Sequence, residues 1–324
     1  MSSSSNATAA RKREVPDEAS DFPDALLEGL RAEPKRIPCK FFYDSEGSRL
    51  FEKISALPEY YLTRTELSLL SLHAQEFANL IGPEGEIVEF GAGSSAKIRA
   101  LLNGLDRPRA YIPIDISGPY LKSVARALEA DYPKLSVRPL VADFSGTLQP
   151  AIFSCDARRR IGFFPGSTIG NFAPEDAKRF LSDAARLLKG GGLLIGVDLV
   201  KDPAILHAAY NDSAGITALF NKNLLRRANR DAEANFDIAR FAHYAPYNPV
   251  ARRIEMYLVS TATQRVTVCG RSIHFAEGEA IETEWSYKYS VDDFRALSIA
   301  AGFVPRKVWC DEDRLFSLHW LEAP

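Results

Sequence analysis

The stretch that decides the fold is Ile87–Lys97, with the sequence IVEFGAGSSAK. It starts with apolar, largely β-branched or aromatic residues, with the carboxylate of Glu89 among them, and this predicts a buried strand. Gly91 and Gly93 then form a turn, and two serines precede a helix that we expect to open near Ala96. Glycines let the backbone approach a ligand closely, and a helix N-terminus offers unpaired N–H groups. The loop therefore predicts a site for a cofactor with an adenosine and a charged tail.

A glycine turn of this kind has more than one interpretation. G-x-G turns also bind dinucleotides, although the third glycine of a G-x-G-x-x-G fingerprint is replaced here by Ala96. A nicotinamide oxidoreductase, a catalytically silent binding module and a tight turn without any ligand all stay open at this point.

Strand and helix patterns alternate from Ile87 to Val200, which predicts a parallel sheet with its sites at the carboxyl ends of the strands. Asp115 ends the second expected strand, where a carboxylate can accept both hydroxyls of a ribose. Asp143 and Phe144 follow the third, and offer an acceptor for an exocyclic amine and an aromatic face for an adenine. Taken singly, each aspartate is equally consistent with a helix N-cap or a turn. The expected strands after the first are Ala110–Ile116, Leu135–Val141, Ile161–Phe164 and Leu193–Val200.

The alternation ends after Val200. Lys201–Asn229 is largely helical in pattern, and Arg252–Tyr289 alternates as antiparallel β-structure, so a different architecture is inserted there. The pattern then returns to a helix and two strands that form a terminal hairpin. Other expected elements are helices at Phe22–Ala32, Ser45–Ile54, Thr63–Leu80, Pro119–Asp131, Pro174–Leu188 and Ser290–Ala301, and the hairpin strands Phe303–Asp311 and Arg314–Glu322.

Composition narrows the class of protein. The chain has 324 residues, a formal net charge of −2 and 46% hydrophobic residues, which is typical of a globular protein with one large or two modest domains. The charge argues against a nucleic-acid partner, and no apolar run approaches the roughly 20 residues of a membrane span. Four dispersed cysteines and five scattered histidines argue against disulfides, zinc and metal catalysis, and favour a cytoplasmic protein.

Longer motifs carry a resemblance to a known family. The helix after the fifth strand and the terminal hairpin resemble the class I S-adenosylmethionine-dependent methyltransferase core. The segments KFFYDSEGSRLFEKISALPEYYLTRTE, VEFGAGSS, FFPGSTIGNF, AYNDSAGITALFNKNLL, IEMYLVS and TEWSYKYS resemble the histidine-specific Nα-methyltransferases of ergothioneine biosynthesis, from about Lys40 to the C-terminus. The resemblance implies a Rossmann-like, mostly parallel α/β sheet with a terminal antiparallel hairpin and an added α+β substrate-binding domain.

The resemblance also implies domain boundaries and site residues. Residues 21–62 and 201–287 would form a substrate-binding domain, and 63–200 with 288–324 the S-adenosylmethionine-binding domain. Residues 1–20 have no counterpart in the resemblance, and their serine- and alanine-rich composition predicts a disordered tail. S-adenosylmethionine would contact Gly91, Gly93, Lys97, Asp115, Asp143 and Phe144, and L-histidine would contact Tyr60, Asn171, Tyr210, Met256, Glu284 and Ser286. Tyr43, Asn171 and Gly166 would hold the catalytic positions, without a metal. The implied product is Nα,Nα,Nα-trimethylhistidine (hercynine), made by a monomer.

Chemistry at these residues is consistent with methyl transfer, which needs alignment and a neutral amine more than a strong base. Asn171 can both donate to a carboxylate and accept from an amine, and Glu284 can accept an imidazole N–H. Tyr43 and Tyr60 can face a methylated ammonium through cation–π contact. No residue stands out as a general base. The same fold acting on another amine, such as tryptophan, is the main alternative.

Overall fold

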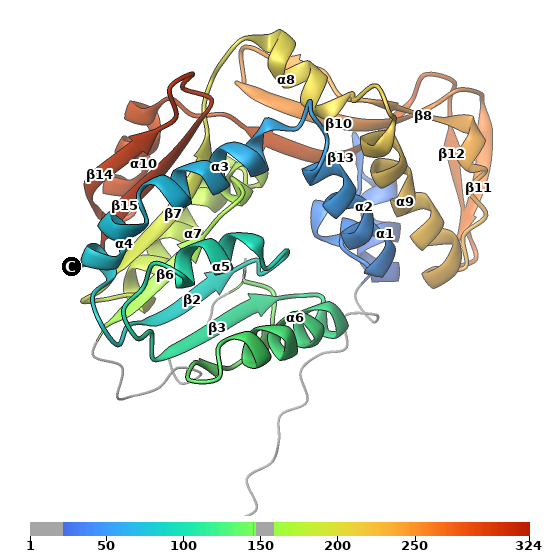
Figure 1. Cartoon of the computed structure of the whole chain (residues 1–324). Coiled ribbons are helices and arrows are strands. Elements are labelled where there is room, and N and C mark those ends of the chain that lie inside the picture. The colour runs from blue at the N-terminus through green and yellow to red at the C-terminus, as the bar shows by residue number, and fades with distance from the viewer. Residues whose placement is uncertain (1–21, 145, 147–158) are drawn as a thin grey trace, which may run out of the picture.

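The computed structural model describes residues 22–144, 146 and 159–324. The expected disordered tail at residues 1–20 lies outside them. Two sheets dominate the described chain, and Figure 1 shows them side by side, joined along the helices α2 and α3. None of the helices in the described ranges has the length and apolar character that crossing a bilayer requires.

The larger sheet has eight strands in the order β14-β15-β7-β6-β2-β3-β4, with β5 also paired to β3. Pairing is parallel from β7 to β4 and antiparallel through β15 and β14. The expected mostly parallel sheet with a terminal antiparallel hairpin is therefore confirmed. Its strands are β2 (Glu86–Phe90), β3 (Ala110–Asp115), β4 (Ser136–Val137), β5 (Leu140–Val141), β6 (Arg160–Phe164), β7 (Gly192–Asp198), β14 (Val304–Cys310) and β15 (Phe316–Glu322).

Helices cover both faces of this sheet, because successive residues of a buried strand point to opposite sides. In β2, Ile87 joins the core beneath one helical layer, while Val88 and Phe90 join the core on the other side. One layer contains α3 (Tyr61–Leu72), α4 (Ala74–Ile81), α5 (Ala96–Leu102) and α6 (Gly118–Asp131), and the other contains α7 (Pro174–Leu187) and α10 (Val291–Ala300).

The smaller sheet has five strands, in the order β1-β13-β10-β8 with β9 beside β10. Its first strand comes from the N-terminal segment and pairs in parallel with β13. The elements of this part are α1 (Phe22–Arg31), β1 (Lys35–Arg36), the 3₁₀ turn η1 (Cys39–Phe42), α2 (Ser45–Ser55), α8 (Pro203–Tyr210), α9 (Ile216–Asp231), η4 (Ile238–Arg240), β8 (Phe241–Tyr244), β9 (Tyr247–Asn248), β10 (Arg253–Ser260) and β13 (Ala280–Tyr287). A separate hairpin consists of β11 (Gln264–Val268) and β12 (Arg271–Phe275).

Two sequence expectations were wrong in detail. The single helix expected at Thr63–Leu80 is broken at His73, so that Leu70 of α3 and Phe77 of α4 can both pack into the core. The third strand expected at Leu135–Val141 is split into β4 and β5, because Pro139 lies between them and has no N–H for a ladder hydrogen bond.

Candidate active site

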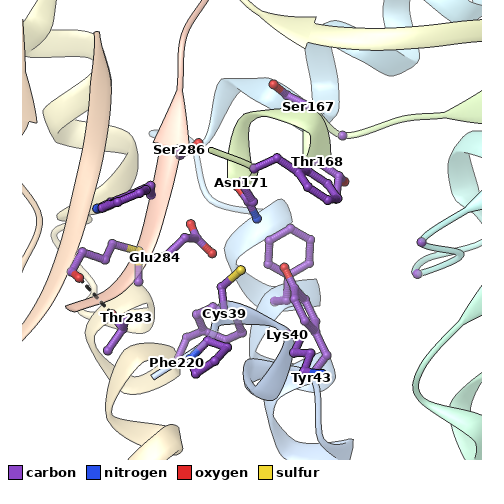
Figure 2. A pocket seen from close by; sticks show the side chains of 18 of the residues that line it. Cys39, Lys40, Tyr43, Ser167, Thr168, Asn171, Phe220, Thr283, Glu284 and Ser286 are labelled. Carbon is purple, nitrogen blue, oxygen red and sulfur yellow. Dashed lines mark hydrogen bonds between the residues drawn. The ribbon is translucent and has the colours of Figure 1, made fainter. Parts of the chain in front are cut away.

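A cavity of about 760 Å³ lies between the carboxyl ends of the parallel strands and the smaller sheet. All of the residues that the family resemblance implies for cofactor and substrate line this one cavity. Figure 2 shows Glu284, Asn171 and Cys39 pointing toward one another across it, with Tyr43 beside Cys39. The two sheets therefore contribute opposite walls of a single site.

The glycine loop forms the cofactor end of the cavity. Gly91 has φ +72° and its N–H donates to the carbonyl of Ile114 at 2.9 Å, which draws the loop against β3. A Cβ at Gly91 would lie 3.3 Å from the ring of Phe144, whereas a Cβ at Gly93 would meet nothing within 4 Å. Open space beside Gly93 is what the close approach of a ligand to the backbone requires.

Carboxylates stand at the ends of the neighbouring strands. Asp115 is the last residue of β3, and its Oδ1 accepts the N–H of Ser117 at 2.8 Å. Burial raises the pKa of this carboxyl to about 6. The carboxylate of Asp143 forms an ion pair with the ammonium of Lys40 at 3.3 Å. Donor hydroxyls of a ribose match the carboxylate of Asp115, so the residues at this end fit the adenosine of S-adenosylmethionine.

An ion pair between the buried Glu66 and the partly exposed Lys97 lies in the wall of the cavity. Glu66 has no exposed surface, and its two oxygens accept the N–H of Gly166 at 2.9 and 3.0 Å. Its Oε2 is also 2.7 Å from the ammonium of Lys97. Gly166 has φ +80°, and a Cβ there would lie 3.0 Å from that ammonium. Because Glu66 occupies its N–H, Gly166 can shape the cavity wall but cannot donate this hydrogen bond to a substrate.

We expect Glu66→Gln to lower the free energy of unfolding by about 1–3 kcal/mol, because Glu66 is buried and its carboxylate accepts the Gly166 N–H and pairs with the partly exposed ammonium of Lys97. Urea titration at pH 7 measures this. The double variant Glu66→Gln/Lys97→Met removes both charges and should recover part of the loss. An unchanged unfolding free energy in Glu66→Gln would mean that the pair contributes nothing.

The substrate end is organised by the smaller sheet. Glu284 on β13 is paired directly opposite Met256 on β10, so both side chains project from the same face. Ser286 is two residues on and shares that face, and its Oγ accepts the hydroxyl proton of Tyr210 at 2.8 Å. Trp285 lies on the other face, where the guanidinium of Arg253 stacks 3.7 Å from its ring centroid.

The carboxylate of Glu284 lines the cavity at this end. It forms no hydrogen bond with any residue in the described part of the chain, and burial raises its pKa to about 7, against the lowering effect of Lys288. The amide of Asn171, at the end of the 3₁₀ turn η3 (Thr168–Asn171), likewise has no hydrogen-bond partner among the described residues. A Cβ at Gly170 would lie 2.7 Å from the carbonyl of Tyr287, so only glycine lets this turn pack against β13. Close packing thus brings two unpaired polar groups to one cavity.

Aromatic rings enclose the remaining side. Tyr43 lies edge-on to Phe51 and Phe220, with centroids 5.7 and 5.8 Å apart, and Phe51 lies edge-on to Tyr60 at 6.1 Å. Burial raises the pKa of both tyrosines well above 10, so each keeps its phenolic proton at neutral pH. They can donate hydrogen bonds and offer ring faces, but they are not bases there.

Sequence reasoning missed several residues of this site. Cys39, Phe51 and Phe220 line the cavity, and burial raises the pKa of the Cys39 thiol to about 12, so it stays protonated. Glu66 and Lys288 do not line the cavity, but they contact residues that do: Glu66 contacts Gly166 and Lys97, and Lys288 contacts Ser286. For Lys288 a signal was present, since residues 284, 286 and 288 alternate within the stretch expected to be β-structure and would share a face there.

The fold and the carboxylates at its strand ends define a class I S-adenosylmethionine-dependent methyltransferase, and S-adenosylmethionine is its methyl donor. Residues 22–323 match the family described as "Histidine-specific methyltransferase, SAM-dependent", and the chain belongs to that family.

Two relatives, one bacterial and one fungal, are consistent with this assignment. The chain is 40% identical to histidine N-alpha-methyltransferase of Mycolicibacterium smegmatis, over 90% of this chain and 91% of that protein. It is 31% identical to ergothioneine biosynthesis protein 1 of Neurospora crassa, over 85% of this chain and 32% of that protein. A solved S-adenosylmethionine-dependent methyltransferase from Clostridium acetobutylicum is similar over 86% of this chain and 97% of that chain, with 11% identity and a TM-score of 0.47.

Proposed function

We propose that this protein methylates the α-amino group of L-histidine three times, giving Nα,Nα,Nα-trimethylhistidine as the first step toward ergothioneine. The observation that carries the proposal is the carboxylate of Glu284, which has no hydrogen bond within the described chain and lines the same cavity as Ser286 and the glycine loop. The names of the two relatives described above support it.

Recognition of the imidazole falls to Glu284 and Ser286. The carboxylate accepts the ring N–H, and the hydroxyl pairs with the other ring nitrogen. A substrate with an apolar side chain leaves the buried carboxylate without a partner, which costs about 1–3 kcal/mol. Phenylalanine and leucine are rejected in this way.

The amino-acid backbone is held at the centre of the cavity. Asn171 donates to the substrate carboxylate and accepts from its amine, while Tyr210 lies beside the same group. S-adenosylmethionine supplies a sulfonium-bound methyl group when bound. The amine must be neutral to attack it, and Tyr43 and Tyr60 cannot take its proton because both stay protonated themselves. The cage of aromatic rings around Tyr43 and Tyr60 then stabilises the methylated, positively charged products.

Two further features complete the proposal. The part built on the smaller sheet, residues 21–62 and 201–287, binds histidine, and the larger sheet with residues 63–200 and 288–324 binds the methyl donor. A single chain supplies every proposed contact, so a monomer would be sufficient for activity. We place it in the cytoplasm, without a nucleic-acid partner, in agreement with the free thiols of Cys39, Cys269 and Cys310 in the described ranges and the net charge of −2.

The test is a mass spectrum of the products from purified protein, S-adenosylmethionine and L-histidine. We expect the mass of histidine to rise by three methyl groups, with S-adenosylhomocysteine formed in proportion. Tryptophan, phenylalanine and leucine are assayed in parallel and should give no product. Turnover of tryptophan without turnover of histidine would contradict the proposal.

A further inference from the structure

Lys288 lies directly behind the substrate end of the cavity, just after β13. Its side chain has no exposed surface, and its ammonium lies 2.8 Å from Asp198 Oδ2. It also donates to Ser286 Oγ at 2.8 Å and to the hydroxyl oxygen of Tyr210 at 3.1 Å. An ammonium carries three protons, so all three are used inside the protein.

These contacts fix what the two hydroxyls can do. A hydroxyl has one proton and two acceptor positions. Tyr210 and Ser286 are 2.8 Å apart and share one hydrogen bond, and each also accepts from Lys288. One of their two protons is used between them, and the other cannot point at the ammonium. The remaining proton is therefore directed away from Lys288, toward the cavity that both residues line.

Lys288 shares its buried counter-ion, Asp198, with a second lysine. Asp198 is fully buried and also pairs with Lys201 at 2.5 Å, while the hydroxyl of Tyr61 donates to the same carboxylate. Two ammonium groups thus share one carboxylate. The other acid that faces Lys288 is Glu284, whose pKa Lys288 lowers against the effect of burial.

We propose that Lys288 is a positioning residue for the amino-acid substrate. It makes the Tyr210–Ser286 pair a hydrogen-bond donor toward the substrate, and it supplies the positive charge that faces Glu284. This role rests on the proposed function, because that function assigns Tyr210, Ser286 and Glu284 to histidine.

Lys201 offers a matched control. It is buried and pairs with Asp198 as Lys288 does, but it contacts neither Tyr210 nor Ser286 and does not line the cavity. Lys288→Met should raise KM for histidine about tenfold or more, while kcat and the affinity for S-adenosylhomocysteine stay unchanged. Lys201→Met should leave KM for histidine unchanged.

A pH profile separates positioning from a merely structural role. In Lys288→Met, Glu284 loses the cation that lowers its pKa, so the acidic limb of kcat/KM for histidine should move to higher pH. The other titratable and polar groups around the site are unchanged in this variant: Asp198, Lys201, Tyr61, Tyr210 and Ser286. In the control variant Lys201→Met the acidic limb should stay at the wild-type pH. An unmoved limb and an unchanged KM in Lys288→Met would overturn the proposal.

A charge-balanced pair covers the case in which Lys288→Met does not fold. Asp198→Asn/Lys288→Met and Asp198→Asn/Lys201→Met each lose one acid and one lysine, and they differ only in whether the remaining lysine contacts the hydroxyls. If the two double variants have equal KM values for histidine, the role of Lys288 is overturned, while the proposed function is unaffected. A wild-type protein that neither binds nor methylates histidine would overturn the proposed function, and this role with it.

Discussion

Glu284→Ala is expected to lower kcat/KM for histidine by about 10- to 100-fold, because a hydrogen bond to a charged group contributes about 1.5–3 kcal/mol. The carboxylate has no hydrogen bond within the described chain, so its removal leaves no protein group there unpaired. Affinity for S-adenosylhomocysteine should stay at the wild-type value. Steady-state kinetics and calorimetry measure the two quantities, and equal losses of both would contradict a contact with the imidazole alone.

Glu284→Gln separates charge from shape. An amide keeps the size of the side chain and one acceptor oxygen but has no ionisation, so the limb of kcat/KM that falls as pH drops through about 7 should disappear. The free substrate has the same pKa values in assays of the wild type and of Glu284→Gln. A difference between the two pH profiles of kcat/KM is therefore caused by the ionisation of Glu284.

The same carboxyl affects stability in the opposite direction. Its pKa is about 7 in the folded protein and 4.5 ordinarily, so the folded state holds this proton more tightly than the unfolded state. Its contribution to stability is therefore fully present below pH 4.5 and is lost as the pH rises through 7. Glu284→Gln should accordingly raise the unfolding free energy of the ligand-free protein at pH 8, while it impairs turnover.

Local patterns were sufficient to predict the sheet that binds the cofactor. Glycine turns, apolar strands and helix caps are read within a few residues of one another, as for Ser290, whose side chain accepts the N–H of Asp293 at the start of α10 as expected. Carboxyl ends of parallel strands necessarily share one edge, so Asp115 and Asp143 could be placed together without coordinates.

Long-range contacts could not be predicted from patterns of this kind. β1 has two residues, and it exists only because β13, more than 240 positions later, offers it a free edge. Antiparallel β-structure was expected over Arg252–Tyr289, but the separate hairpin of β11 and β12 was not. In the structure its turn residues Cys269 and Gly270 both have positive φ, as a two-residue hairpin turn requires. Likewise, Glu66 looks like one polar residue of an amphipathic helix until the fold brings it to Lys97 and Gly166.

Asp115→Ala should weaken binding of S-adenosylmethionine about a hundredfold or more, because two ribose hydroxyls lose a charged acceptor that contributes about 1.5–3 kcal/mol to each bond. Asp115 is not among the proposed histidine contacts, and Glu284 and Ser286, which would bind the imidazole, lie on the other sheet, so the intrinsic affinity for histidine should change little. Calorimetry with S-adenosylhomocysteine measures the loss, and an unchanged affinity would remove Asp115 from the cofactor site.

Asp115→Asn tests the simpler interpretation, in which this residue only fixes the start of α6 by accepting the N–H of Ser117 at 2.8 Å. Asparagine accepts that N–H equally well, but it replaces one acceptor oxygen with a donor and cannot take both ribose hydroxyls. A residue that served only the backbone would bind ligand normally as asparagine, whereas a ribose acceptor would remain impaired. Since burial raises the pKa of Asp115 to about 6, wild-type affinity should also fall as the pH drops through 6, and Asp115→Asn should lack that dependence. The pH response therefore distinguishes a carboxylate that binds the cofactor from one that only orders the loop.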